Sequence, residues 1–180
     1  MFMIAKYRLE RKEKNGVLVI VEEDPPPCPC CGGELKYRDP RSRIRKKEGE
    51  EEDQHLIIPR YRCQNPECKR YHNGLPDCLV PHKHYEAEEI SGVVDRIVTE
   101  DDEDSERFPC AATMRRWIMW LTGNIPNIDG HFRRKAEQDK RFLDLTFERI
   151  HQKTQRWLEV ILRLIYNSGG ALPAHPEACT

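Results

Sequence analysis

The sequence predicts an α+β protein, in which a small N-terminal β-hairpin and further short strands precede an all-helical half with a long C-terminal amphipathic helix. Two observations carry this expectation. Short β-branched runs and turn residues concentrate before residue 81, and apolar residues recur at helical spacing from about Tyr85 onward. Since 180 residues suffice for one ordinary domain or two small ones, we expect a β-rich domain over 1–81, a helical domain over 82–170 and a loose tail over 171–180.

The N-terminal strands are predicted from alternation and turn chemistry. Phe2–Leu9 alternates loosely, Val17–Val21 is a compact β-branched run, and an Asn-Gly pair at 15–16 lies between them. Asn-Gly between two apolar runs is the strongest short-range signal for a hairpin. Leu35–Arg38 and Leu56–Arg62 are predicted as two further strands, and the charged segment 39–53 between them as a loop or a strand extension.

Two helices are predicted next. The apolar residues between Tyr85 and Val98 recur every three or four positions and form one face. A second helix is expected from Pro109, a favoured first helical residue, to Thr122, because Gly123, Asn124 and Pro126 are helix-ending signals. Its inward residues would be Met114, Trp117, Ile118 and Leu121.

A long amphipathic helix is predicted over 130–167, where Gly169-Gly170 would end it. Its apolar stripe is expected either to pack onto the preceding helices or to form a dimer interface. The stripe consists of Leu143, Phe147, Ile150, Trp157, Leu158, Ile161, Leu162 and Ile165.

The charge is unevenly distributed, although the formal net charge is only −1. Residues 1–110 hold 19 Lys/Arg against 24 Asp/Glu, whereas residues 111–163 hold 11 against 6, a balance of +5. A basic run from Lys36 to Lys47 precedes an acidic run, and a second acidic run covers Glu100–Glu106. The acidic runs are expected to be solvated loops, whereas the basic stretches favour an anionic partner.

The eight cysteines favour metal binding over disulfides. No apolar run approaches the roughly 20 residues of a membrane span, and the first residues are too short for the core of a signal peptide. We therefore expect a cytoplasmic protein with no membrane partner, in a reducing space where paired cysteines hold metal ions.

The cysteine spacing predicts one structural Zn²⁺ in a zinc ribbon, with Cys28, Cys31, Cys63 and Cys68 as its ligands. Two close pairs about thirty residues apart, each preceded by a strand-like run, are typical of paired hairpin-tip knuckles. Glycines follow Cys31, and glycine permits the positive φ of such a turn. Cys30 and His72 remain alternative ligands, and unrelated buried thiols are the competing interpretation.

The two helices around the Glu100–Glu106 loop are also compatible with a helix-turn-helix. Thr113, Arg115 and Arg116 lie near the start of the second helix, where short polar and arginine side chains contact DNA in such proteins. An Arg-Arg pair on an amphipathic helix is more often a solvated face, so this signal is weak by itself.

Several strings resemble an uncharacterised family of bacterial zinc-ribbon plus helix-turn-helix proteins, which is similar to the N-terminal DNA-binding part of insertion-sequence transposases. The resemblance covers roughly residues 28–165, with two departures: a longer second cysteine pair and a longer loop between the helices. It implies DNA binding, and it adds Lys83 and His84 as contacts to phosphate. The strings are Cys28–Gly33, Tyr61-Arg62-Cys63, Arg70-Tyr71-His72, Leu75–Tyr85 and Thr113–Trp117.

These observations predict a zinc-containing protein that binds double-stranded DNA, as a regulator or accessory factor related to mobile-element transposases. The alternative is a zinc-stabilised adaptor between proteins, in which the C-terminal helix binds a partner or forms a homodimer. We do not expect an enzyme, because no metalloprotease-type His-Glu-x-x-His motif, phosphate-binding glycine loop or nucleophile elbow is present.

Overall fold

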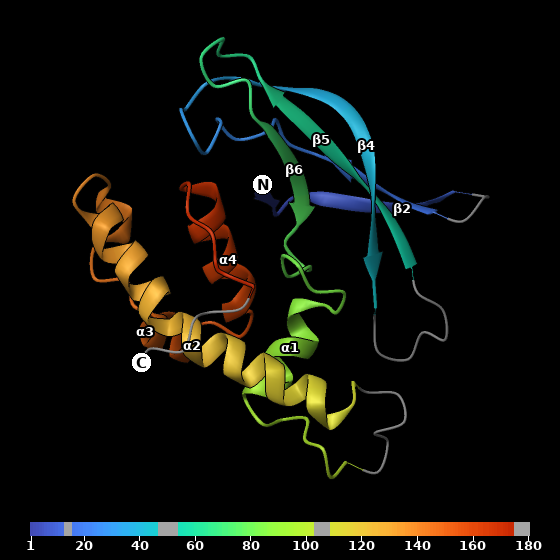
Figure 1. The fold of residues 1–180 in the computed structure, drawn as a ribbon, viewed down its shortest axis with the longest axis vertical. Coiled ribbons are helices and arrows are strands. Elements are labelled where there is room, and N and C mark those ends of the chain that lie inside the picture. Colours follow the sequence, from blue (N-terminus) through green and yellow to red (C-terminus); the bar gives the residue numbers. More distant parts are fainter. Residues whose placement is uncertain (13–15, 47–53, 103–108, 175–180) are drawn as a thin grey trace.

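The computed structural model describes residues 1–12, 16–46, 54–102 and 109–174. Six strands form one mixed sheet, and helices pack beside one part of it (Figure 1). The strands are β1 (Phe2–Ile4), β2 (Tyr7–Lys12), β3 (Gly16–Val21), β4 (Leu35–Arg45), β5 (Gln54–Cys63) and β6 (Tyr71–Pro76).

β5 organises the sheet because three strands pair with it. β4 runs antiparallel to it along its whole length, with a register shift between Tyr37 and Asp39. The other edge of β5 is divided: its residues 60–62 pair antiparallel with β6, and its residues 56–57 pair parallel with β3. β2 then extends the sheet beyond β3, and β1 extends it beyond β6 in parallel.

The helical elements follow the sheet in sequence. They are α1 (Ala87–Val94), α2 (Ala111–Ala136), the 3₁₀ turn η2 (Lys140–Phe142), α3 (Phe147–Lys153) and α4 (Trp157–Asn167). α4 packs against β1, and α1 packs against α2 and α4. Asn167 at the end of α4 accepts from the Met3 N–H (2.7 Å) and donates to the Met3 carbonyl (3.1 Å), so it hydrogen-bonds the outer edge of β1.

Sheet and helices share the main hydrophobic core. Met3, Leu56 and Leu75 from the sheet belong to the same cluster as Phe132 and Leu158 from the helices, and all five are almost fully buried. A second, smaller cluster lies at the cysteine end of the sheet. It consists of Phe2, Ile4, Cys28, Leu35, Tyr61 and Cys63. Neighbouring residues of β1 therefore face different clusters, as strand alternation requires.

The predicted fold class is wrong. The hairpin of β2 and β3 is present, with its turn residues 13–15 outside the described part, but it is one edge of a six-stranded sheet. β1 and β6 pair in parallel across some seventy residues of sequence, and no local signal encodes such pairing. Asn73 and Gly74 are turn formers, yet both lie inside β6, where β1 approaches so closely that a Cβ on Gly74 would lie 2.7 Å from Ile4 Cδ1.

The helical half is not a helix-turn-helix. α2 spans 26 residues instead of ending at Thr122, and it continues through Gly123, Asn124 and Pro126. A proline costs a helix interior about 3 kcal/mol, which packing offsets here: Ile128 and Phe132, beyond the proline, are fully buried. The buried Asn124 amide also donates to the Trp120 carbonyl (2.9 Å) and thereby satisfies a group inside the helix.

The predicted long C-terminal helix is also wrong, because three short elements and the end of α2 replace it. Helix starts inside the stretch come from capping residues: Asp139 accepts from the Arg141 N–H and Thr146 from the Arg149 N–H. Asp144 has a φ of +60°, which interrupts helical geometry between them. Most of the predicted stripe is still buried or half-buried, but Leu143 is 61% exposed.

Candidate functional site

The first cysteine pair lies in a closed turn. The Gly32 N–H donates to the Cys28 carbonyl and the Cys28 N–H donates to the Gly33 carbonyl, both at 2.8 Å. Gly32 has a φ of +74°, a conformation that glycine adopts without strain. A Cβ on Gly33 would lie 3.2 Å from the Cys63 sulfur, so a glycine at position 33 lets the two cysteine pairs approach each other.

The second pair lies in the turn that joins β5 to β6. The Asn65 carbonyl accepts from the Cys68 N–H (3.1 Å) and from the Lys69 N–H (3.0 Å), and Lys69 has a φ of +50°. The Cys63 N–H donates to the Arg70 carbonyl (2.9 Å), which closes the base of the turn. The four residues between Cys63 and Cys68 are therefore accommodated in a compact loop.

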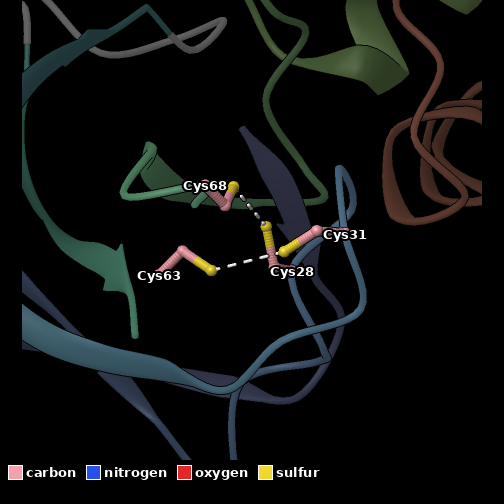
Figure 2. A group of neighbouring side chains, drawn as sticks. All are labelled: Cys28, Cys31, Cys63 and Cys68. Carbon is pink, nitrogen blue, oxygen red and sulfur yellow. Dashed lines mark hydrogen bonds between the residues drawn. The ribbon is translucent and has the colours of Figure 1, made fainter. Parts of the chain in front are cut away.

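The four sulfurs converge between these turns (Figure 2). The sulfurs of Cys28 and Cys68 are 3.8 Å apart, those of Cys31 and Cys63 are 3.5 Å apart, and all four lie within 4.8 Å of one another. Disulfide sulfurs would be about 2.05 Å apart. A tetrahedral metal with bonds of about 2.3 Å to sulfur separates its ligands by about 3.8 Å. The predicted clustering is confirmed, and the donor set fits a metal ion.

The thiols differ in acidity. The backbone N–H of Gly33 lowers the pKa of Cys31 to about 7, whereas burial raises the pKa of Cys63 to about 12. Both effects are ordinary, since an N–H stabilises a thiolate and an apolar surrounding destabilises it. A cation among the four sulfurs would favour the thiolate form of all of them.

The imidazole of His72 and the thiol of Cys30 lie beside the four sulfurs. His72 on β6 is buried, and its Nε2 lies 3.3 Å from the Cys28 sulfur. Burial lowers the pKa of His72 to about 4, so its ring is neutral near pH 7. The exposed Cys30 lies 3.4 Å from Arg70 Nη1. Cys28, Cys30 and His72 form a second group whose donor atoms lie within 4.8 Å of one another.

The opposite side of the same strands carries positive charge around an aromatic ring. Tyr71 is 46% exposed, and the guanidinium carbons of Arg38, Arg60 and Arg62 lie 4.4, 5.4 and 5.9 Å from its ring centroid. Lys36, Arg62 and Tyr71 are register neighbours on β4, β5 and β6. We call these five residues, Lys36, Arg38, Arg60, Arg62 and Tyr71, the basic face.

One carboxylate partly neutralises the basic face. Asp39 accepts two hydrogen bonds from Arg60 and lies 3.6 Å from the Arg38 guanidinium. The Arg60 contact keeps the pKa of Asp39 below its usual range, so Asp39 is charged near neutral pH. Lys36 lies 3.8 Å from Glu34, and both side chains are exposed. Arg62 is exposed beside Tyr71, and its guanidinium adds a further positive charge to the basic face.

The predicted DNA-contacting residues lie in two places. Arg115 and Arg116 are exposed on the first turns of α2, and Thr113 is half-buried beside Cys110. Lys83 contacts α2 further along the helix, with its Nζ 4.4 Å from the centroid of the Trp120 ring. Burial lowers the pKa of Lys83.

His84, the last of the predicted DNA-contacting residues, lies in the segment that precedes α1. His84 is exposed, and its carbonyl accepts from the Lys46 N–H at the end of the sheet (2.7 Å). Through Lys83 and His84, the segment that precedes α1 contacts both α2 and the residue that follows β4. Sequence reasoning missed the basic face, although the run Lys36–Lys47 contained two of its five residues, Lys36 and Arg38. Neither the pairing of Lys36 with Arg62 nor that of Arg62 with Tyr71 is visible without the sheet register.

Among the helices that the structure describes, none combines the length and the apolar character of a membrane span. Residues 28–117 match the family model described as a domain of unknown function, DUF6431. The match covers half of the chain, so the protein belongs to this family. It includes both cysteine pairs, the basic face and the start of α2. A search of curated proteins and a search of solved structures found no significant match.

Proposed function

We propose that this protein is a zinc-containing, non-enzymatic DNA-binding protein that acts as a regulator or accessory factor of a mobile element. The basic face carries the proposal: three guanidinium groups surround one exposed tyrosine ring, on strands that the four-cysteine site holds together. The link to mobile elements rests on the sequence resemblance alone, whose most specific part is the string Leu75–Tyr85.

Zinc is the ion that the four sulfurs favour. Thiolate ligands select soft or borderline ions, and a tetrahedral set of four thiolates is typical of structural zinc. Such a site has no open position for a substrate, so it stabilises the fold instead of catalysing a reaction. Cys28, Cys31, Cys63 and Cys68 would hold the ion and thereby fix the ends of β4, β5 and β6.

Strand alternation connects the metal to the basic face. Along β5, Tyr61 and Cys63 belong to the buried cysteine-end cluster, whereas Arg60 and Arg62 point to the other side. Along β6, His72 is buried and Tyr71 is exposed. The metal would therefore lie on the opposite side of the strands from the cationic side chains, and it would fix the strands that carry them.

Charge and shape favour DNA as the partner. DNA offers a phosphate at short intervals along each strand, and Lys and Arg that neutralise phosphates supply sequence-independent affinity. The basic face lies on three paired strands, β4, β5 and β6, and some DNA-binding proteins place the strands of a sheet in a groove of the duplex. Arg115 and Arg116 on α2, with Lys83 and His84, are proposed as a second contact region.

The test is fluorescence anisotropy with mixed-sequence duplex DNA at two salt concentrations. We expect salt-dependent binding by the wild type, and a weaker affinity with a flatter salt slope for the double variant Arg38→Ala, Arg62→Ala. Each lost phosphate contact should reduce the slope of log K against log salt by about 0.9. The matched control is Arg133→Ala with Arg134→Ala, which removes the same charge at the other end of α2.

The variant Arg115→Ala with Arg116→Ala measures the contribution of α2 in the same assay. A parallel titration with single-stranded DNA distinguishes binding to the duplex from stacking of unpaired bases on Tyr71. If the wild type does not bind duplex DNA even at low salt, the DNA-binding proposal is wrong and the adaptor alternative takes its place. If all three double variants weaken binding equally, the affinity comes from overall charge and the basic face has no special role.

A further inference from the structure

We propose that the cysteine end binds two divalent metal ions, with the second ion held by Cys28, Cys30 and His72. This inference builds on the four-cysteine site of the proposed function, because the Cys28 sulfur would bridge the two ions. The three donor atoms belong to different parts of the chain: two lie in the turn before β4, and His72 lies on β6.

The geometry fits a second ion. With metal–sulfur bonds of about 2.3 Å and metal–nitrogen bonds of about 2.05 Å, a tetrahedral ion separates a sulfur and a nitrogen ligand by about 3.6 Å. The Cys28 sulfur and His72 Nε2 are 3.3 Å apart, and Cys30 Sγ lies within 4.8 Å of both. His72 is only 4% exposed, and its Nε2 faces the Cys28 sulfur inside the protein.

Charge balance favours two ions over one. Five cysteine sulfurs gather at this end of the sheet, and each thiol that binds a metal releases its proton to solvent. One divalent ion leaves three negative charges if all five are thiolates. Two divalent ions supply four positive charges, and two cations of the protein adjoin the group: the Arg70 guanidinium lies 3.4 Å from the Cys30 sulfur, and the Met1 ammonium lies 3.1 Å from His72 Nδ1.

The two sites would differ in access. The four-sulfur ion has a closed set of protein ligands, whereas the second ion has three protein ligands and an open fourth position. Cys30 is exposed, so this position faces solvent and would hold water or an external ligand. An ion with an open position exchanges more readily than one in a closed site, so we expect the second ion to be removed first by a chelator.

The experiment is native mass spectrometry of the full chain after reconstitution with zinc and removal of the excess. We expect two ions in the wild type, and one ion in Cys30→Ser and in His72→Asn. The control is Cys110→Ser, which removes another exposed thiol far from the cluster and should retain two ions. In a titration with Co²⁺, the thiolate-to-cobalt absorption should rise up to two equivalents in the wild type and one in Cys30→Ser.

The outcomes separate this inference from the proposed function. A single ion in the wild type that Cys68→Ser removes would overturn the second site and leave the four-cysteine site intact. Two ions in the double variant Cys30→Ser, His72→Asn would overturn the assignment of these ligands. No ion in the wild type would contradict both proposals. Because Cys30 is exposed, Cys30→Ser should fold, and its circular dichroism should match that of the wild type.

Discussion

The two ends of the sheet are stabilised by different means. At the cysteine end, a small cluster of Phe2, Ile4, Leu35 and Tyr61 lies beside the four thiols. At the helical end, a far larger core includes Trp117, Phe132 and Leu158. A buried large apolar side chain contributes about 1.5–3 kcal/mol. The cysteine end buries few such residues, so we expect its stability to depend on a bound metal, whereas the larger helical core should be stable without one.

This difference indicates a division of roles along β5 and β6. β5 ends at Cys63 and β6 follows Cys68, and both strands contribute to the main core, through Leu56 on β5 and Leu75 on β6. Figure 1 shows β6 leading toward the helices. The helical end would keep the chain folded, and the metal would shape the surface on which the basic face lies. The following predictions test whether the two ends respond independently, from the largest expected effect to the smallest.

Metal removal should have the largest effect, and it should be confined to the cysteine end. Structural zinc contributes on the order of 10 kcal/mol in small zinc-dependent peptides, so chelation should expose the backbone amides of Cys63, Cys68 and His72. Hydrogen exchange followed by mass spectrometry measures this. Peptides from α4 should keep their protection. Exchange that rises equally in α4 would mean that the two ends unfold as one unit.

The variant Phe132→Ala should act on the other end. Phe132 is fully buried and contacts His131 and Phe142 through ring interactions. Truncating a buried phenylalanine to alanine costs about 3–5 kcal/mol, so the midpoint of urea denaturation should fall sharply. The zinc content of the folded variant should not change. Loss of zinc in this variant, under conditions where it stays folded, would contradict the separation of the two ends.

The same contrast explains which features the sequence predicts. The cysteine turns are local structures: Gly32 and Gly33 shape the first, and the segment from Cys63 to Arg70 closes the second. Their spacing therefore predicts that the four sulfurs meet. The hairpin of β2 and β3 is local too. β1 and β6 pair across the chain, and Asn73 and Gly74 look like a turn because turn propensity ignores the neighbouring strand.

At the helical end, local signals predict helix boundaries that packing and capping change. Pro126 and Gly123 are reliable helix-ending signals for an isolated segment, but tertiary packing of Ile128 and Phe132 overrides them. The stretch after α2 has continuous helical periodicity, yet capping by Asp139 and Thr146 divides it. The basic face was hidden for another reason, since its residues come from three strands and only the register brings them together.

Gly33→Ala should weaken the metal site without changing any ligand. A Cβ at this position would lie 3.1 Å from Asn65 Cβ and 3.2 Å from the Cys63 sulfur, so the two cysteine turns must move apart. Overpacking of this kind costs about 1–3 kcal/mol, which corresponds to a metal affinity lower by about 5- to 150-fold. Competition with a chromophoric chelator measures it.

Gly92→Ala is the control for this variant. Its Cβ would lie 3.7 Å from Val98 Cγ2, an ordinary contact, and Gly92 is inside α1 at the helical end. Gly92→Ala should therefore leave the metal affinity unchanged. If Gly33→Ala binds zinc as tightly as the wild type, the close approach of the two turns is not required for the site.

An effect of similar size to that of Gly33→Ala is expected at the connection between the two ends, which is β1. Phe2 and Ile4 belong to the cysteine-end cluster and Met3 to the helical core, while Asn167 on α4 hydrogen-bonds both backbone groups of Met3. A hydrogen bond contributes about 0.5–1.5 kcal/mol, so Asn167→Ala should destabilise the protein by about 1–3 kcal/mol in urea denaturation. Asn167→Asp keeps an oxygen that accepts from the Met3 N–H but sets a second acceptor oxygen against the Met3 carbonyl, so it should not restore the stability of the wild type. Faster exchange of Tyr61 and Cys63 amides in Asn167→Ala would show that β1 transmits the loss to the cysteine end; unchanged exchange there would show that the metal holds that end by itself.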